Sequence, residues 1–265
     1  MTAEGWAAVI AAVLLAAAFV GVSLAKGRRW PWLVLGLRAG AAAALVLAVV
    51  WLAMAQGFWS AADGRQVAAG LALSVVVVNL LLGVWHPSMR TGGAGPAADA
   101  LAAGLALCIV LLPAPDATLQ RPAILSQVGW ILTLLGAGTL GVAGSTALTL
   151  GVRAALVSRG RGALWPPRAN LHDFLYRATA LACVALGAGL TIAVWWAWRT
   201  SGSPDGGDPR QVWAAAATVL AVASLWAARL GRQSGRWSAA LAGVAAVLAL
   251  TGLLAGVDVQ QAMTF

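Results

Sequence analysis

Long, uninterrupted apolar runs are the feature that most restricts what this chain can fold into. Eight runs approach the roughly 20 residues that a helix needs to cross a bilayer. They cover about residues 5–25, 32–55, 67–85, 97–113, 127–151, 171–198, 212–230 and 237–257. The runs lack the apolar/polar alternation of a barrel strand, and lipid admits only helices or closed barrels. The sequence therefore predicts an all-α polytopic membrane helix bundle with eight transmembrane helices.

Composition supports this fold class. Hydrophobic residues make up 61% of the 265 residues and charged residues only 9%, which leaves too little polar surface for a water-soluble globule of this size. The longest connections are short, so we expect a single transmembrane domain over residues 1–265. The first run follows Glu4 and precedes Lys26, the reverse of the charge order in a secretory signal peptide. We therefore expect this first helix to be retained.

Positive charges are distributed unevenly between the two sets of connections. Eleven Lys and Arg residues follow odd-numbered runs, and four fall on the other side, namely Arg65, Arg121, Arg199 and Arg210. This bias predicts that both termini lie on the outer, periplasmic side of a bacterial inner membrane. The net charge of +9 is then explained by topology, and nucleic acid is not an expected partner.

Few polar residues lie inside the expected helices. In the first four, we single out only Asn79 and Arg38, and we expect no ionisable residue at a helix centre of the kind found on an ion path. Either Arg38 snorkels back to the headgroups, or it anchors an anion such as a haem propionate or a lipid phosphate. Ala137, Gly141 and Ser145 recur every four residues, which predicts close packing of a neighbouring helix, with a cofactor slot as the alternative.

The two histidines of the chain, His86 and His172, lie at ends of the third and sixth expected helices. They are candidate axial ligands of a haem if those helices are neighbours, with Arg38 or Arg177 near the propionates. Two solvated side chains are the simpler interpretation. Asp173 and Arg177 are four residues apart on one helical face and predict an ion pair. No catalytic or metal-binding motif is recognised, so we expect no metal site and do not favour an enzyme.

The C-terminal part carries a more specific pattern. "LYR" (175–177) opens the sixth helix, "TIAVW" (191–195) comes near its end, "DPRQVW" (208–213) follows a polar loop, and Arg229 ends the seventh helix. In this order the segment resembles the cytochrome c assembly family, the CcsA, ResC and CcmC type of haem-handling membrane proteins. These proteins carry a tryptophan-rich outer loop called the WWD domain. The resemblance covers about residues 64–257 and is closest to the small HemX-like members.

The departures from the family fall where it binds haem. By collinear matching, two haem-ligating histidines of the family correspond to Gln127 and Ala227. The segment 199–211 then corresponds to a degenerate WWD-like outer loop whose middle has become "SGSPDGG". A porphyrin needs flat contact area and an iron ligand. The resemblance therefore implies an inherited fold without the outer haem site.

Residues kept in this loop have a structural interpretation. Asp208 followed by Pro209 favours a helix start, because the carboxylate accepts from orphan backbone N–H groups and proline has none to lose. Trp198 and Trp213 flank the loop and are expected at the outer membrane interface, where an indole contacts both hydrocarbon and water. We expect these four residues to build structure and not to bind a cofactor.

Together these observations predict a divergent, non-catalytic protein of the cytochrome c assembly type. It would be an accessory or structural subunit in cytochrome c maturation or in a larger membrane redox or photosynthetic complex. Expected partners are the lipid bilayer and other membrane subunits, including a c-type cytochrome or its maturation machinery, and no cofactor is expected. One alternative is an active haem-handling or haem-relay protein with a cytoplasmic-side site. Another is a small-molecule permease.

Overall fold

The computed structural model describes residues 2–24, 31–56, 63–85, 94–112, 124–157, 168–202, 209–230 and 234–262. Within these ranges the regular elements are all α-helices. In chain order they are α1 (Ala3–Leu24), α2 (Pro31–Gln56), α3 (Gly64–Trp85), α5 (Ala94–Leu111), α6 (Ile124–Val157), α7 (Arg168–Ser201), α8 (Pro209–Arg229) and α9 (Ser234–Ala262).

The predicted spans are confirmed in number and type. Among the described residues, eight helices are long and apolar enough to cross a membrane. The main differences lie in α6 and α7, with 34 residues each, and in α9, with 29 residues. These helices extend beyond the expected 127–151, 171–198 and 237–257. Hydropathy marks the part of a helix that matches the hydrocarbon core. Backbone hydrogen bonds continue past that point, so the helices end later than their apolar windows.

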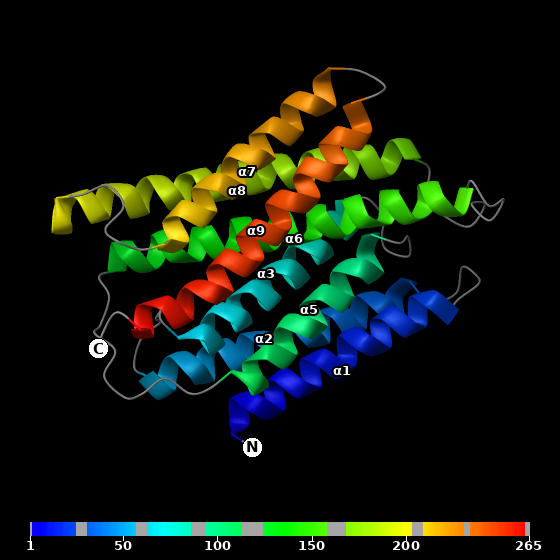
Figure 1. Ribbon diagram of the computed structural model, residues 1–265. Coiled ribbons are helices and arrows are strands. Elements are labelled where there is room, and N and C mark those ends of the chain that lie inside the picture. Colours follow the sequence, from blue (N-terminus) through cyan, green and yellow to red (C-terminus); the bar gives the residue numbers. More distant parts are fainter. Residues whose placement is uncertain are drawn as a thin grey trace.

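Successive helices run in opposite directions through one bundle (Figure 1). We call the end that holds the first residues of α1, α3, α6 and α8 the terminal end, because α9 also finishes there. The other end, where α2, α5, α7 and α9 begin, is called the far end. With an even number of antiparallel helices, the start of α1 and the finish of α9 necessarily share one end.

Helix α6 is the centre of the bundle. It packs against α3, α5, α7 and α9 and crosses behind α9 in Figure 1. Of its membrane-crossing window 72% is buried, compared with 22% for α8. The first four helices therefore form one group and the last three another, with α6 joining them.

Small residues allow this central position. A Cβ added at Gly141 would lie 2.9 Å from Leu101 Cδ2 of α5, and one added at Gly144 would lie 2.6 Å from Ala246 Cβ of α9. Real side chains do not approach so closely, so α5 and α9 reach α6 only because these Cβ atoms are missing. The close packing predicted for the stripe of Ala137, Gly141 and Ser145 is confirmed, and Ala137 is fully buried.

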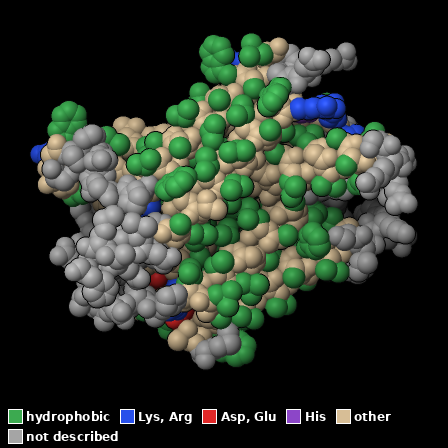
Figure 2. All heavy atoms as spheres, viewed as in Figure 1, with side chains coloured by type: hydrophobic (Ala, Val, Ile, Leu, Met, Phe, Trp, Pro, Cys, Tyr) green, Lys and Arg blue, Asp and Glu red, His purple; other side chains and the backbone are tan. Residues whose placement is uncertain are grey.

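The outer surface of the bundle is apolar. Figure 2 shows hydrophobic side chains spread over the middle of the viewed face, with basic side chains mainly toward its two ends. Strongly exposed tryptophans lie near helix ends, including Trp6, Trp32, Trp85, Trp198, Trp226 and Trp237. This distribution is typical of a surface that meets hydrocarbon in its middle and headgroups at its edges.

Candidate functional site

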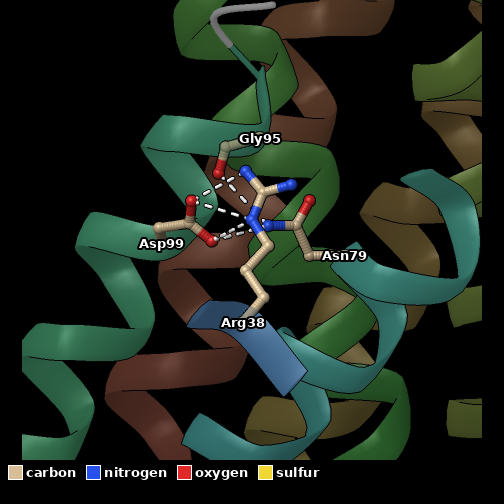
Figure 3. Close-up of polar contacts among 4 residues, drawn as sticks. All are labelled: Arg38, Asn79, Gly95 and Asp99. Carbon is tan, nitrogen blue, oxygen red and sulfur yellow. Dashed lines mark hydrogen bonds and ion pairs between the residues drawn. The ribbon is translucent and has the colours of Figure 1, made fainter. Parts of the chain in front are cut away.

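A buried polar cluster joins three helices near the far end. Arg38 of α2, Asn79 of α3 and Asp99 of α5 point toward one another (Figure 3). Arg38 and Asp99 are each 1% exposed and Asn79 is 3% exposed. We call these three residues the Arg38 cluster. Ionisable residues inside a membrane bundle are costly and usually pair with one another.

Hydrogen bonds close the cluster around the carboxylate. Arg38 Nε donates to Asp99 Oδ1 at 2.9 Å and to Oδ2 at 3.0 Å, and Arg38 Nη2 donates to Oδ2 at 2.7 Å. Asn79 Nδ2 donates to Asp99 Oδ1 at 2.9 Å and to the Gly95 carbonyl at 3.2 Å. Both carboxylate oxygens therefore accept from donors of the chain itself. Such charge-assisted bonds are among the stronger ones in proteins.

Two sequence-based expectations change at this cluster. The Arg38 side chain does not snorkel to the surface, and the anion that it holds is Asp99 of the same chain. Asp99, which lies inside an apolar helix, was also overlooked when only Asn79 and Arg38 were singled out in the first four helices. An acid in such a run, with Arg38 and Asn79 in nearby helices, was the signal that could have found the cluster.

A second polar group ties α1, α2 and α3 together at the terminal end. Arg65 Nη2 lies 2.6 Å from Glu4 Oε1, with both side chains 14% exposed. Gln66 Nε2 donates to the Leu52 carbonyl at 3.3 Å. Asp63 Oδ1 accepts from the Arg65 backbone N–H at 2.9 Å and so caps α3. These contacts fix helix ends.

Of the two predicted haem ligands, the structure describes only His172. His86 lies outside the described residues. His172 is half-buried near the start of α7, where its Nε2 accepts a hydrogen bond from Arg168 Nε at 3.2 Å. The helices packed against α7 are α6, α8 and α9, whereas α3 packs against α2, α5, α6 and α9. Among the described residues, α3 and α7 are therefore not extensively packed against each other, and the His86–His172 pair stays a prediction.

The other candidate near the start of α7 belongs to a surface ion pair. Arg177 Nε lies 3.1 Å from Asp173 Oδ2, and the two side chains are 54% and 47% exposed. The predicted pairing of these residues is confirmed. An exposed pair of this kind contributes little to stability, so its role is local.

A large groove opens on the face of α6 between α5 and α9. Its volume is about 1530 Å³. The lining runs from Gly141 to Val157 on α6 and from Gly235 to Leu250 on α9, with Ala97 and Leu101 contributed by α5. Arg153, Arg168, His172 and Arg236 line it toward the far end. We call this feature the α6/α9 groove; it includes two residues of the small-residue stripe.

Residues that carry the family resemblance are partly brought together. Arg229 Nη2 donates to the Tyr176 hydroxyl at 3.2 Å, which links the end of α8 to the third turn of α7. Gln127 and Ala227, however, lie near the start of α6 and near the end of α8. Since these helices run in the same direction, the two positions are at opposite ends of the bundle. Side chains at these two positions could therefore not ligate the same iron.

The residues expected to build the loop between α7 and α8 are also partly described. Asp208 lies outside the described residues, and Pro209 is the first residue of α8. Trp213 is 43% exposed, and its ring covers Gly252 of α9, where a Cβ would overlap it. Trp198 near the end of α7 is 67% exposed. Trp213 therefore packs two helices together, a contact that the sequence did not reveal.

The class defined by this fold is an all-helical integral membrane protein. Within the described ranges, no group of three His, Cys, Asp or Glu side chains could hold a metal ion. The chain matches no protein-family model, no curated protein and no solved structure in the comparisons. The cytochrome c assembly resemblance stays a prediction from the motifs quoted above.

Proposed function

We propose that the chain is a non-catalytic membrane protein of the cytochrome c assembly type, an accessory or structural subunit. Its setting would be cytochrome c maturation or a larger membrane redox or photosynthetic complex. The observation that carries the non-catalytic role is the closure of the Arg38 cluster. A carboxylate that moves protons or ions must exchange its partners, whereas both oxygens of Asp99 are held by Arg38 and Asn79. For the same reason a permease that uses this acid is disfavoured.

The contact between Tyr176 and Arg229 supports the assembly-type part of the proposal. Both residues belong to the motifs that resemble the family, and they lie 53 positions apart in the chain. The hydrogen bond gives these two motif positions a shared role in joining α7 to α8. This is the role expected of residues retained for the fold after loss of a cofactor site.

The proposed orientation puts the far end in the cytoplasm of a bacterium. The described basic residues at that end include Arg153, Arg168, Arg229 and Arg236, in line with the charge bias between connections. The proposed partners, other membrane subunits or a c-type cytochrome, would meet the protein in or at the bilayer.

Deletion of the gene tests this function. Haem covalently attached to c-type cytochromes, and the assembly of each membrane redox complex, are measured in the deletion strain. We expect either the amount of attached haem or the assembly of one redox complex to fall in the deletion strain and to be restored by the wild-type chain. The isolated chain should contain no haem. Normal cytochromes and normal complexes in the deletion strain would contradict the proposal.

A haem-handling protein is the second candidate, favoured by one observation. His172 lines the α6/α9 groove beside Arg168, so an imidazole and a cation stand together at a space large enough for a porphyrin. A reduced-minus-oxidised spectrum and a pyridine haemochrome assay on the isolated chain distinguish the two candidates. One haem per chain, lost in His172→Ala, would establish this second function and exclude the first.

A further inference from the structure

The α6/α9 groove has one charged end. Arg153, Arg168 and Arg236 come from α6, α7 and α9 and line it together near the far end. Among the described residues that line it there is no Asp or Glu. Three cations without a facing acid favour an anionic occupant, and basic pockets between transmembrane helices are known to take acidic lipid headgroups.

One of these arginines has an unused donor. Arg153 Nη1 is inaccessible to solvent and has no hydrogen-bond partner within the described part of the chain. A buried guanidinium donor without an acceptor is unfavourable, because it loses water and gains no hydrogen bond in return. An anion seated at this end of the groove would supply the acceptor.

The rest of the groove is apolar and elongated. At about 1.5 Å per residue, its α6 wall from Gly141 to Val157 is roughly 24 Å long. Its volume of about 1530 Å³ exceeds the 300–1,000 Å³ of typical small-molecule sites. Val244 and Val247 of its α9 wall are more than half exposed, so the groove opens where the surface meets hydrocarbon.

The shape and chemistry of the walls distinguish among anionic ligands. Apart from the three arginines and His172, the described lining residues are small or aliphatic and include no Trp, Tyr or Phe. A porphyrin prefers flat aromatic contact, whereas an extended acyl chain fits a long aliphatic channel. Inorganic phosphate would satisfy the arginines but would leave the apolar walls uncovered.

We propose that the α6/α9 groove is a binding site for an acidic phospholipid. The phosphate lies among Arg153, Arg168 and Arg236, and an acyl chain follows the walls of α6 and α9 toward the terminal end. The lipid bridges α5, α6 and α9 and completes the bundle on this face. This inference is independent of the proposed function.

Lipid binding to the purified full-length chain in neutral detergent tests the site. The probes are phosphatidylglycerol, phosphatidylcholine, inorganic phosphate and haemin, each followed by native mass spectrometry and by thermal unfolding. We expect one or two phosphatidylglycerol molecules retained per chain and a rise in unfolding temperature, because a ligand that binds only the folded state stabilises it. Phosphatidylcholine should bind at least about tenfold more weakly than phosphatidylglycerol.

Matched variants locate the site. Arg153→Gln with Arg236→Gln should weaken phosphatidylglycerol binding about tenfold or more, while Arg199→Gln at the terminal end should leave it unchanged. Ala240→Phe keeps every charge and fills the groove from an exposed position of α9, so it serves if the double arginine variant does not fold. It should also weaken lipid binding.

Several results would overturn the assignment. Equal binding of phosphatidylcholine, an equal loss in Arg199→Gln, or unchanged binding in both groove variants would each exclude a specific acidic-lipid site. Inorganic phosphate that protects as well as the lipid would reduce the site to an ion site. Haemin that binds more tightly than phosphatidylglycerol, and displaces it, would assign the groove to haem instead.

Discussion

Arg38 and Asp99 are 61 positions apart in the chain and make three hydrogen bonds with one another inside the bundle. With side chains 2% and 0% exposed, neither charge can exchange its partner for water. The pair connects α2 to α5, and Asn79 adds α3 to the same contact. The packing of the first helices depends on these charges remaining matched.

Removing the acid should therefore strongly destabilise the protein. Asp99→Asn leaves the Arg38 guanidinium buried without its carboxylate, and breaking a buried pair in this way costs about 3–5 kcal/mol. Thermal unfolding in detergent measures the loss. The exposed Asp173→Asn is the matched control, with an expected change of less than about 1 kcal/mol. The joint change Arg38→Met with Asp99→Leu should recover much of the stability, and failure to recover any would argue that the charges are needed for another purpose.

Helix spacing around α6 should be intolerant of added side chains. A Cβ at Gly136 would lie 2.7 Å from the backbone nitrogen of Leu186 on α7, so Gly136→Val forces the two helices apart at a cost of about 1–3 kcal/mol. The control is Gly187→Ala, where a Cβ meets nothing within 4 Å; it should be neutral or slightly stabilising. The two variants are compared by unfolding temperature and by yield in membranes. If Gly136→Val and Gly187→Ala changed stability equally, α6 and α7 would have to lie farther apart than the structure places them.

The start of α8 should depend on its preceding residue. Asp208 directly precedes Pro209, the first residue of the helix, and the sequence predicts that its carboxylate caps the free backbone N–H groups. Asp208→Ala should lower the free energy of unfolding by about 0.5–2 kcal/mol. Asp208→Asn, which keeps a capping oxygen, should cost much less. A change in a visible absorption band without a change in stability would instead assign this residue to a cofactor.

The two ends of the bundle should differ in access from outside the cell. Ala169 near the start of α7 and Thr200 near its end are both exposed and can each be replaced by cysteine after the native Cys108 and Cys183 are changed to Ala. A membrane-impermeant maleimide should label Thr200→Cys in spheroplasts and Ala169→Cys only after lysis. The reverse pattern would overturn the orientation inferred from the charge bias.

The sequence by itself determined the fold class and nearly all the helix positions. Runs such as 32–55 and 67–85 are long and uniformly apolar, and in lipid such a run must satisfy its backbone hydrogen bonds internally as a helix. It also predicted the Asp173–Arg177 pair, because both members lie on one helix and a four-residue spacing puts them on the same face.

Only the tertiary structure decided which helices are neighbours. Arg38 became a partner of Asp99, Arg229 of Tyr176, and Trp213 a cover for Gly252 because separate helices meet there. The α6/α9 groove likewise exists only because residues of α5, α6, α7 and α9 come together in the bundle. Hydrophobicity drives each helix into lipid without choosing its neighbour. That choice depends on small residues and on a few polar pairs, whose matching becomes visible only in three dimensions.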